Sequence, residues 1–398
     1  MPRQAIELDE ARALVLSRVV PLASERVELA QALGRVLAEP LRAAADLPGF
    51  DNSSMDGFAL RAGESAPGAR LRVVGESRAG APSRQALGAG EACAISTGAA
   101  IPPGADAVVR VEDTRRDGDD VELAVAVPVG ASVRYAGEDV KAGEALLEPG
   151  VRLGPAELGI LAALGSGELT VYRRPRVGVV TTGDELVAVG GRLPPGGVHD
   201  SGAIVVPALV GRAGGEVYSI AHARDSAVAI EQALERALVA DVVVVCGGMS
   251  VGEHDHVGAV LDALGVAREF AGVALRPGRP TLFGTRGETL VFGLPGNPVS
   301  SFVTFLIFVR PVLLALAGER PDARRARAKL AKPAAREPGR IHAVRCTLEL
   351  RDDGWWATST GAQGSHVLRS LLGADAFALI PAGEGQLDVG EQVVVELI

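Results

Sequence analysis

The sequence predicts a multidomain α/β-plus-β protein with a three-layer α/β domain at its centre, and three observations support this fold class. A chain of 398 residues is too long for one hydrophobic core, so it should form two to four domains. Strand patterns alternate with helix patterns from Arg176 to about Gly318, which is typical of a mostly parallel sheet covered by helices. Short β-rich runs divided by Gly and Pro fill residues 46–134 and the region after about Lys332, which predicts small β domains on both sides.

The N-terminal part changes from a helical to a β-rich pattern and back. Apolar residues recur at helical spacing over residues 7–38, where a proline divides two predicted helices, and a further short helix is predicted to start at Pro155. Because helical segments stand on both sides of the β-rich stretch, we expect residues 1–23 and 137–173 to pack as one elongated domain. Residues 24–136 would then form an inserted, mainly β domain.

The α/β domain is expected over residues 174–325, followed by a β-rich domain over residues 326–398. Its first strand lies in Arg176–Leu186, RVGVVTTGDEL, where continuous β-branched residues indicate a strand buried on both faces. Asp184 is then a candidate N-cap of a following helix. Glu185 would lie at the carboxyl end of a parallel strand, where open α/β sheets bind ligands. The alternative is an acidic residue at an ordinary helix start.

Composition and charge restrict the class of protein. The net charge of −9 argues against broad nucleic-acid binding. The chain has three widely spaced cysteines, Cys93, Cys246 and Cys346. They form no CxxC pair, which argues against a zinc knuckle or a disulfide framework and fits a reducing compartment. The longest apolar helix candidate, residues 299–316, is interrupted by Arg310 and Pro311 and is expected to be buried, not membrane-spanning. We therefore expect a cytoplasmic protein without a membrane partner.

Four polar loops follow predicted strands of the α/β domain, and TTGDEL is the first. The second, residues 246–256, contains Gly247, Gly248 and Ser250, and such a run lets backbone N–H groups approach an anion closely. It lacks the GK[ST] of a Walker A loop and the spacing of a dinucleotide fingerprint.

The same loop continues as His254-Asp255-His256. A solvated turn is the simplest interpretation, and zinc would need more nitrogen or sulfur ligands than the sequence offers nearby. Asp255 is an oxygen ligand that is expected to share magnesium with Glu185 or Asp184.

The third and fourth loops also suit an anion. In RPGRP, two guanidinium groups three residues apart, Arg276 and Arg279, are placed to clamp phosphate or another tetrahedral oxyanion; the alternative is a surface turn with solvated arginines. The fourth loop contains Pro295, Gly296, Asn297 and Ser300. It opens a helix whose free N–H groups favour anions, although capping by asparagine would also explain it.

Together these loops predict group transfer on a phosphorylated ligand, in which positioning and electrostatics supply most of the catalysis. The sequence contains no obvious Ser/His/Asp or Cys/His nucleophile.

In their order along the chain, these motifs resemble the molybdopterin molybdenumtransferase family. The resemblance covers nearly the whole chain. It rests on the segments DNSSMDGFAL (51–60), STGAAIPPGADAVV (96–109), GEDV (137–140), TTGDEL, GGMSVGEHD, PGNPVS and TGAQGSH (360–366). Each segment is a weak signal, whereas their conjunction is specific.

The resemblance implies a four-domain homodimer with a molybdenum-cofactor-binding α/β domain and a C-terminal β-barrel. It implies that adenylylated molybdopterin is hydrolysed in a Mg²⁺-dependent step as molybdate is inserted, with release of AMP. The active site would lie between the α/β domain of one subunit and the β domain of the other.

The resemblance also implies roles for individual residues. The matched catalytic residues are Asp56, Thr97, Asp139, Glu185, Asp225 and Asp255. Glu185 and Asp255 would also bind the metal, and the first two would face them from the partner subunit. Asp139 lies in a turn that forms without any ligand, so a structural role is its alternative. Asp200, Ser201 and Ser365 would contact the substrate, as would the anion-suited residues of the second, third and fourth loops.

Three positions depart from the family pattern. The basic loop of the family usually carries lysines where this chain has Arg276 and Arg279. Because arginine presents a broad planar fork in place of a compact ammonium, we expect anion binding to be retained and oxyanion discrimination or turnover to shift. Cys246 stands where a small hydroxyl residue is common, and we expect it to be a buried substitution.

Two other functions fit parts of the same pattern. One is the preceding adenylyl transfer to molybdopterin, because the same α/β fold serves that step. The other is a non-catalytic molybdopterin-binding or scaffold role. The expected partners are the small-molecule substrates, a second copy of the chain, the upstream adenylyltransferase and molybdoenzyme chaperones.

Overall fold

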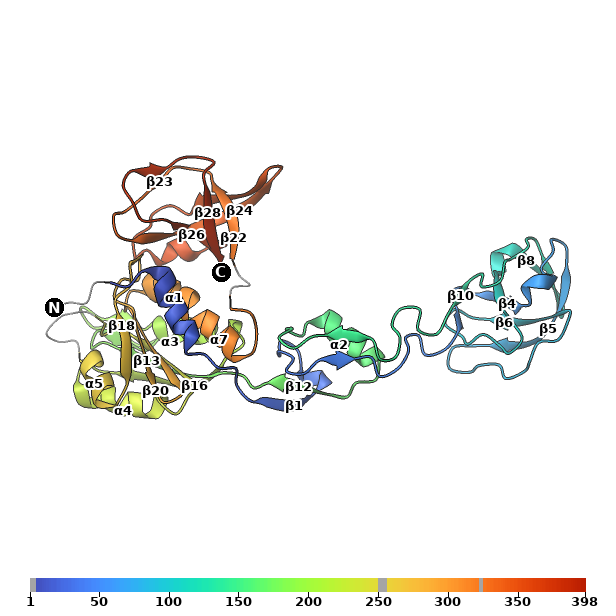
Figure 1. Cartoon of the computed structure of the whole chain (residues 1–398), viewed down its shortest axis with the longest axis horizontal. Coiled ribbons are helices and arrows are strands. Elements are labelled where there is room, and N and C mark those ends of the chain that lie inside the picture. Colours follow the sequence, from blue (N-terminus) through green and yellow to red (C-terminus); the bar gives the residue numbers. More distant parts are fainter. Residues whose placement is uncertain (1–4, 250–255, 322–324) are drawn as a thin grey trace.

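The computed structural model describes residues 5–249, 256–321 and 325–398. The molecule is elongated (Figure 1). An α/β unit and a β-barrel lie together at one end, a small mixed unit follows, and a β unit lies at the far end. The fold class is therefore the multidomain α/β-plus-β arrangement that the sequence predicts.

The α/β unit is built on a six-stranded mixed sheet. Its strands in spatial order are β16 (Glu216–Ala223), β13 (Arg176–Thr182), β17 (Val242–Cys246), β21 (Thr289–Leu294), β20 (Leu282–Arg286) and β18 (Ala267–Ala271). The first four are parallel, and β20 runs antiparallel to both of its neighbours. Every residue of β17 is buried, as expected for a central parallel strand covered on both faces.

Helices cover both faces of this sheet and complete the three layers. The helices are α3 (Gly202–Arg212), α4 (Ala227–Ala237), α5 (Val257–Ala263), α6 (Pro298–Thr304) and α7 (Arg310–Leu316). Residues of α4 and α5 form the core on one face, whereas α3, α6 and α7 form the core on the other. A π-helical segment, Phe305–Val309, joins α6 to α7. The resulting segment Pro298–Leu316 is long and apolar enough to cross a membrane, but 89% of its most apolar 18-residue stretch is buried inside the protein.

The N-terminal helix α1 (Leu8–Ser17) packs against the α/β unit, where Leu8 and Val15 join the same core as α7. The prediction of a second helix within residues 7–38 is wrong. The chain instead forms strand β1 (Ser24–Glu28) and a 3₁₀ turn, Leu29–Gln31. Pairing of β1 with a distant strand overrides the helical spacing there.

The middle unit is assembled from two distant stretches. Strand β1 pairs antiparallel with β12 (Glu168–Tyr172), and β2 (Leu41–Arg42) pairs with β11 (Ala145–Leu147). Helix α2 (Pro155–Ala163) packs on them, with Leu153 and Leu161 in a shared core. This pairing differs from the expected allocation of residues from 24 onwards to the inserted domain. We propose that the β unit is inserted only after about residue 46.

The β unit contains a six-stranded sheet. The order is β7 (Ala107–Arg110), β4 (Gly57–Leu60), β6 (Glu91–Ile95), β5 (Arg70–Ser77), β9 (Asp120–Leu123) and β8 (Thr114–Asp117). A short pair, β3 (Asn52–Ser53) with β10 (Val133–Arg134), stands where the chain enters and leaves. Apolar clusters lie around Phe58 and around Cys93.

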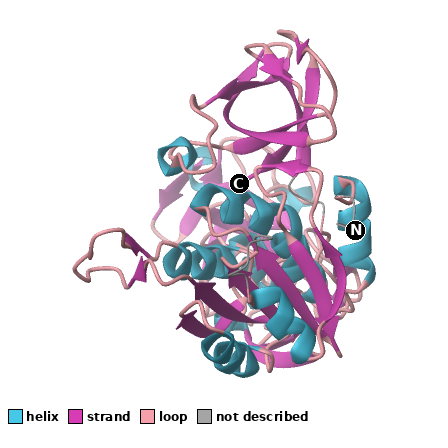
Figure 2. Ribbon diagram, turned by 90° about the vertical axis from the view of Figure 1, so that its left-hand side faces the viewer, coloured by secondary structure: helices cyan, strands magenta, loops and turns pink. Residues whose placement is uncertain are grey.

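The C-terminal unit is a closed barrel (Figure 2). Five strands close it in the order β24 (Ile341–Arg351), β25 (Gly354–Ser359), β22 (Arg325–Leu330), β28 (Gln392–Leu397) and β26 (Ala376–Ile380), which pairs back to β24. The hairpin signal at Asp353-Gly354 is confirmed, because Arg351 pairs with Gly354 across the turn. Short strands β23 (Ala334–Ala335) and β27 (Gln386–Leu387) pair beside the barrel.

One buried carboxylate joins the barrel to the helices below it. Glu396 of β28 is 1% exposed and accepts hydrogen bonds from Arg12 of α1 at 3.1 Å, Arg310 of α7 at 3.0 Å and Arg325 of β22 at 3.0 Å. Three charge-assisted bonds offset the cost of burying this charge, so the contact couples β28 to α1, α7 and β22.

Candidate functional site

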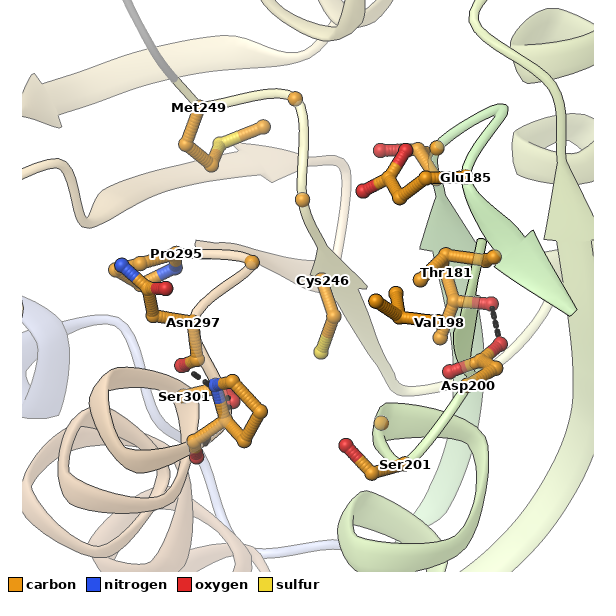
Figure 3. Close-up of a pocket in the computed structure, with 18 of the residues that line it drawn as sticks. Thr181, Glu185, Val198, Asp200, Ser201, Cys246, Met249, Pro295, Asn297 and Ser301 are labelled. Carbon is orange, nitrogen blue, oxygen red and sulfur yellow. Dashed lines mark hydrogen bonds between the residues drawn. The ribbon is translucent and has the colours of Figure 1, made fainter. Parts of the chain in front are cut away.

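A pocket of about 850 Å³ lies at the carboxyl ends of β13, β17 and β21. This size suits a nucleotide-like ligand, and its place is where open α/β sheets bind ligands. All four polar loops contribute residues to its wall, although RPGRP contributes only Pro280. Figure 3 shows Glu185, Met249, Asn297 and Ser201 arranged around the cavity.

The TTGDEL loop does not start a helix. Asp184 and Glu185 form a turn after β13, and the chain continues into β14 (Leu186–Val187), which pairs with β15 (Val198–His199). The expectation that Asp184 caps a helix is therefore wrong, since the next helix begins only at Gly202. Glu185 is exposed and lines the pocket, which leaves its carboxylate available to a ligand.

The turn that carries Glu185 is attached to the end of β16. The Asp184 N–H donates to Asp225 Oδ2 and the Asp225 N–H donates to Asp184 Oδ1, both at 3.3 Å. His222 Nε2 lies 2.9 Å from the Gly183 carbonyl oxygen and donates to it. The structure thus brings Asp225 to the pocket wall, where it helps hold the turn in place. His222 was not predicted, because only strand pairing reveals its neighbour.

Asp200 and Ser201, which follow β15, lie in different environments. Asp200 is 6% exposed; it accepts a hydrogen bond from Thr181 Oγ1 at 2.6 Å and one from the Ala203 N–H at 3.0 Å. Its carboxylate thus caps α3 and ties that helix to β13. Ser201 lines the pocket, its side chain makes no capping bond, and its hydroxyl lies at the cavity in Figure 3.

The glycine loop comes very close to β13. Gly247 has φ +101°, and a Cβ there would lie 2.6 Å from the Thr182 carbonyl oxygen. A Cβ on Gly248 would lie 2.4 Å from Val257 Cγ2. Only glycine fits both positions, so the backbone forms the pocket floor itself. Thr182 Oγ1 is buried beside it and has no hydrogen-bond partner among the described residues. Ser250 and Asp255 lie outside the described residues, so their roles stay predictions.

The PGNPVS loop closes another side of the pocket. Pro295, Gly296 and Asn297 line it between β21 and α6. Asn297 holds the N-cap position of α6, but its side chain makes no capping bond and faces the cavity in Figure 3. Ser300 is 3% exposed inside α6 and does not line the pocket.

Cys246 is buried beneath the pocket, as expected. Burial, followed by the charge of Asp200, raises the pKa of its thiol to about 12. The thiol therefore stays protonated at neutral pH and is not a nucleophile.

Several of the predicted site residues lie outside this pocket. Asp56 and Thr97 meet in the β unit, where the Thr97 N–H donates to Asp56 Oδ1 at 2.7 Å and Thr97 Oγ1 donates to the same atom at 3.1 Å. Both are exposed, and Figure 1 places their unit at the opposite end of the molecule from the pocket. Asp139 is exposed where the β and middle units meet, and its N–H donates to the Leu47 carbonyl oxygen at 3.0 Å.

The two arginines of RPGRP do not line the pocket. Arg276 forms an ion pair with Glu337 of the barrel unit. In the backbone, β19 (Leu275–Arg276) pairs in parallel with β24, and Arg276 stands opposite His342 in this pairing. Ser365 is half-buried in the loop between β25 and the 3₁₀ turn Leu368–Leu371.

A basic cluster that sequence reasoning missed lies at this junction: Arg276, His342 and Arg345. Arg345 is fully buried, and its Nη1 and His342 Nε2 have no hydrogen-bond partner among the described residues. Burial, then the charges of Arg276 and Arg345, lowers the pKa of His342 to about 4. Burial and Arg276 lower the pKa of Arg345 to about 10. The sequence offered one signal for this cluster, an arginine at an inward-facing position of the apolar strand IHAVRC.

The described residues contain no cluster of three or more His, Cys, Asp or Glu side chains suited to a metal. Glu185 offers one carboxylate at the pocket that has no hydrogen-bond or ion-pair partner among the described residues, with Asp184 and Asp225 beside its turn. Magnesium is commonly bound by one or two carboxylates together with substrate phosphates and water. This donor set fits such a shared site and not a closed protein cage.

The fold and the pocket define a class of protein: a multidomain protein whose α/β domain carries a ligand-sized pocket at the carboxyl ends of its parallel strands. Family models match almost the whole chain. Residues 6–165 match the MoeA N-terminal region (domain I and II), residues 178–315 a probable molybdopterin binding domain and residues 327–398 the MoeA C-terminal region (domain IV).

Individual proteins agree with these models. The molybdopterin molybdenumtransferase of Haemophilus influenzae is 35% identical, covering 98% of each chain; that of Bacillus subtilis is 34% identical, covering 100% of this chain and 95% of its own. A crystal structure of a molybdopterin biosynthesis MoeA protein from Pyrococcus horikoshii superposes with a TM-score of 0.84 at 33% identity, covering 99% of each chain. The chain belongs to the molybdopterin molybdenumtransferase family.

Proposed function

We propose that this enzyme inserts molybdate into adenylylated molybdopterin with release of AMP, giving molybdenum cofactor. The observation that carries the proposal is the pocket itself. Its floor is glycine backbone, and the free carboxylate of Glu185 lies in its wall. The curated relatives named molybdopterin molybdenumtransferase support the same activity.

In this proposal the chain's residues bind and orient the phosphoanhydride of the substrate. Backbone N–H groups of the loop after Gly247 and of the first turn of α6 would bind its phosphates, because glycine-rich loops and helix starts offer N–H donors to an anion. The Gly247 N–H itself donates to the Leu294 carbonyl oxygen at 3.1 Å. Asn297 and Ser201 would add side-chain donors. Hydrolysis transfers the adenylyl group from the bridging oxygen of the phosphoanhydride to water, so AMP is released and the phosphate of molybdopterin is the leaving group.

A magnesium ion is proposed to assist this cleavage. Glu185 would hold it together with substrate phosphates, and Asp255 is the second predicted ligand. When bound, Mg²⁺ would neutralise charge on the phosphates. Asp225 would keep the Glu185 turn in place through its two hydrogen bonds to Asp184.

The Asp56–Thr97 pair is proposed to complete the site of a second subunit. The two residues are exposed and preorganised by their mutual hydrogen bonds, yet they lie far from the pocket of their own chain. A homodimer would bring them to the partner's pocket, with Asp139 holding the joint that sets the reach of the β unit.

The basic cluster is proposed to attract the molybdate dianion. The buried guanidinium of Arg345 makes no hydrogen bond to a carboxylate of the described residues, and α6 contacts the 3₁₀ turn that carries its partner Ser370. Arg279 and Ser365 are the further residues predicted to contact the substrate.

We also propose a cytoplasmic location and transient contacts with the upstream adenylyltransferase and molybdoenzyme chaperones.

The activity is tested by reconstitution. Purified protein, adenylylated molybdopterin, molybdate and Mg²⁺ are expected to release AMP, and Glu185→Gln is expected to lower the rate by about 10²–10³-fold, as for loss of a preorganised charged group. Glu231→Gln, on the exposed face of α4, is the matched control. Absence of AMP with every divalent metal contradicts the proposed function. ATP-dependent adenylylation of molybdopterin would instead support the earlier pathway step.

The shared site is tested by mixing two inactive variants. Glu185→Gln and Asp56→Asn chains are expected to regain activity after joint unfolding and refolding, because a mixed dimer contains one intact pocket facing one intact β unit. Recovery approaching a quarter of the wild-type rate fits random mixing of two sites per dimer, given about half the dimers mixed and half their sites intact. No recovery from dimers shown to be mixed would refute the cross-subunit arrangement.

A further inference from the structure

The arginine loop of the α/β unit is in contact with a sharp turn of the barrel unit. Glu337-Pro338-Gly339-Arg340 forms this turn, with a bridge between Glu337 and Arg340 and φ +69° at Gly339. The Glu337 carboxylate forms an ion pair with Arg276 and lies 3.7 Å from Arg340 Nε. Only 20% of the Glu337 side chain is exposed.

Backbone contacts hold the turn against the arginine loop. The Ile341 N–H donates to the Ala274 carbonyl oxygen at 2.9 Å, and Arg276 pairs with His342 in the parallel β19–β24 ladder. The Gly383 N–H donates to the Glu337 carbonyl oxygen at 3.0 Å. The position of the carboxylate therefore follows from the docking of the two units and not from a chance side-chain conformation.

The surroundings of this carboxylate are strongly basic. Arg345 donates to the Ser370 hydroxyl at 3.0 Å and to the carbonyl oxygens of Gly364 at 3.1 Å and Ala362 at 3.4 Å, and none of these acceptors carries a charge. The nearby Arg276 is the group whose charge acts on it. Among the described residues, Glu337 is the carboxylate that forms an ion pair with the basic cluster.

We propose that Glu337 occupies the anion position on Arg276, so that an incoming oxyanion must displace it, and that Glu337 thereby sets the affinity for molybdate. A carboxylate and a tetrahedral oxyanion both present pairs of oxygens that match the guanidinium fork, so they compete for the same donors. The proposal rests on the proposed function, since it takes molybdate as the anion that the basic cluster binds.

The size of the effect follows from exposure. The Arg276 side chain is 46% exposed, and ion pairs of this kind contribute little in water. Replacing the carboxylate by an amide removes the competitor and its repulsion of a dianion. We expect Glu337→Gln to lower the dissociation constant for molybdate about two- to five-fold.

The test is calorimetric titration of the full-length protein with sodium molybdate alone, comparing wild type, Glu337→Gln and a control. Glu349→Gln is the matched control, because Glu349 also forms an ion pair with an arginine of the same barrel, Arg351 at 2.6 Å, but on the β24–β25 hairpin. Thermal unfolding verifies that all three proteins are folded. Sulfate is titrated in parallel to show whether the gain extends to other oxyanions of the same shape.

Tighter binding by Glu337→Gln with no change in Glu349→Gln supports the proposal, and AMP-release assays should then show a lower KM for molybdate with an unchanged kcat. Unchanged or weaker binding by Glu337→Gln overturns it, as does the absence of molybdate binding by both proteins. If the binding gain appears but no protein releases AMP, the proposed function fails while the role of Glu337 stands.

Discussion

At the residue scale, burial decides which ionisable groups are free to act. Glu185 and Asp56 are exposed, whereas Asp200 is buried and its oxygens already accept hydrogen bonds from Thr181 Oγ1 and from the Ala203 N–H at the start of α3. The sequence placed these residues in one motif set but could not rank them, because a carboxylate that caps a helix and one that faces a ligand look alike in sequence. His342 is the clearest case of a side chain whose chemistry is set by its surroundings.

His342 should make stability depend on pH. Its pKa falls from 6.5 to about 4 on folding, so between these values the unfolded chain binds more protons and the free energy of unfolding decreases as pH falls. The full shift corresponds to at most about 3–4 kcal/mol, lost between pH 6.5 and pH 4. His342→Gln is expected to flatten the profile in this window, measured by denaturant unfolding at pH 7, 5.5 and 4.5. His366→Gln, an exposed histidine of the same unit, should leave the slope unchanged. An equal slope in wild type and His342→Gln would refute the assignment.

At the element scale, the pocket depends on how closely the glycine loop approaches the end of β13. The existence of these strands was predictable, since β13 and β17 are both rich in β-branched residues. The contact between Gly247 and Thr182 was not, because a glycine in sequence does not reveal what lies against it. The same holds for the turn after β13, where Asp184 bonds to Asp225 instead of capping a helix.

Gly247→Ala tests this approach. Its Cβ would meet the Thr182 carbonyl oxygen, so β13 and the Glu185 turn must shift, and both stability and AMP release should fall. Gly265→Ala is the matched control, because Gly265 also has positive φ (+77°) but open space for a Cβ. The control should lose about 1–2 kcal/mol of stability from backbone strain alone and keep its activity. Thermal unfolding and AMP release measure the difference. Equal losses in both variants would show that steric contact is unimportant.

At the scale of the whole molecule, the units are joined by a few specific contacts. The ion pair between Arg276 and Glu337 joins the barrel to the arginine loop, and Glu396 joins it to α1 and α7. The alternation of helical and β-rich segments was enough to predict several domains and a β unit inserted into another. It was not enough to place α1 on the α/β unit or to pair β1 with β12, since both contacts bridge long stretches of chain.

Glu396→Gln is expected to weaken the junction between the barrel and the α/β unit. Loss of a buried, hydrogen-bonded carboxylate costs about 3–5 kcal/mol when its cationic partners remain. Both tryptophans of the chain lie in β25, so their fluorescence reports unfolding of the barrel. The midpoint of denaturant unfolding should therefore fall strongly in this variant. Glu349→Gln, which breaks an exposed pair, should change stability by less than about 1 kcal/mol. Similar midpoints for both variants would contradict the role of Glu396.

The sequence by itself determined the fold class, the order of the domains and the loops that carry the candidate site. These properties depend on local patterns and short motifs, which consist of residues close together in the sequence. The tertiary structure alone decided that Glu185 faces a pocket, that Asp200 is used internally, and that Arg276, His342 and Arg345 form a basic cluster with Glu337 on it. These properties depend on contacts between residues far apart in the chain, which the packing of strands and units creates.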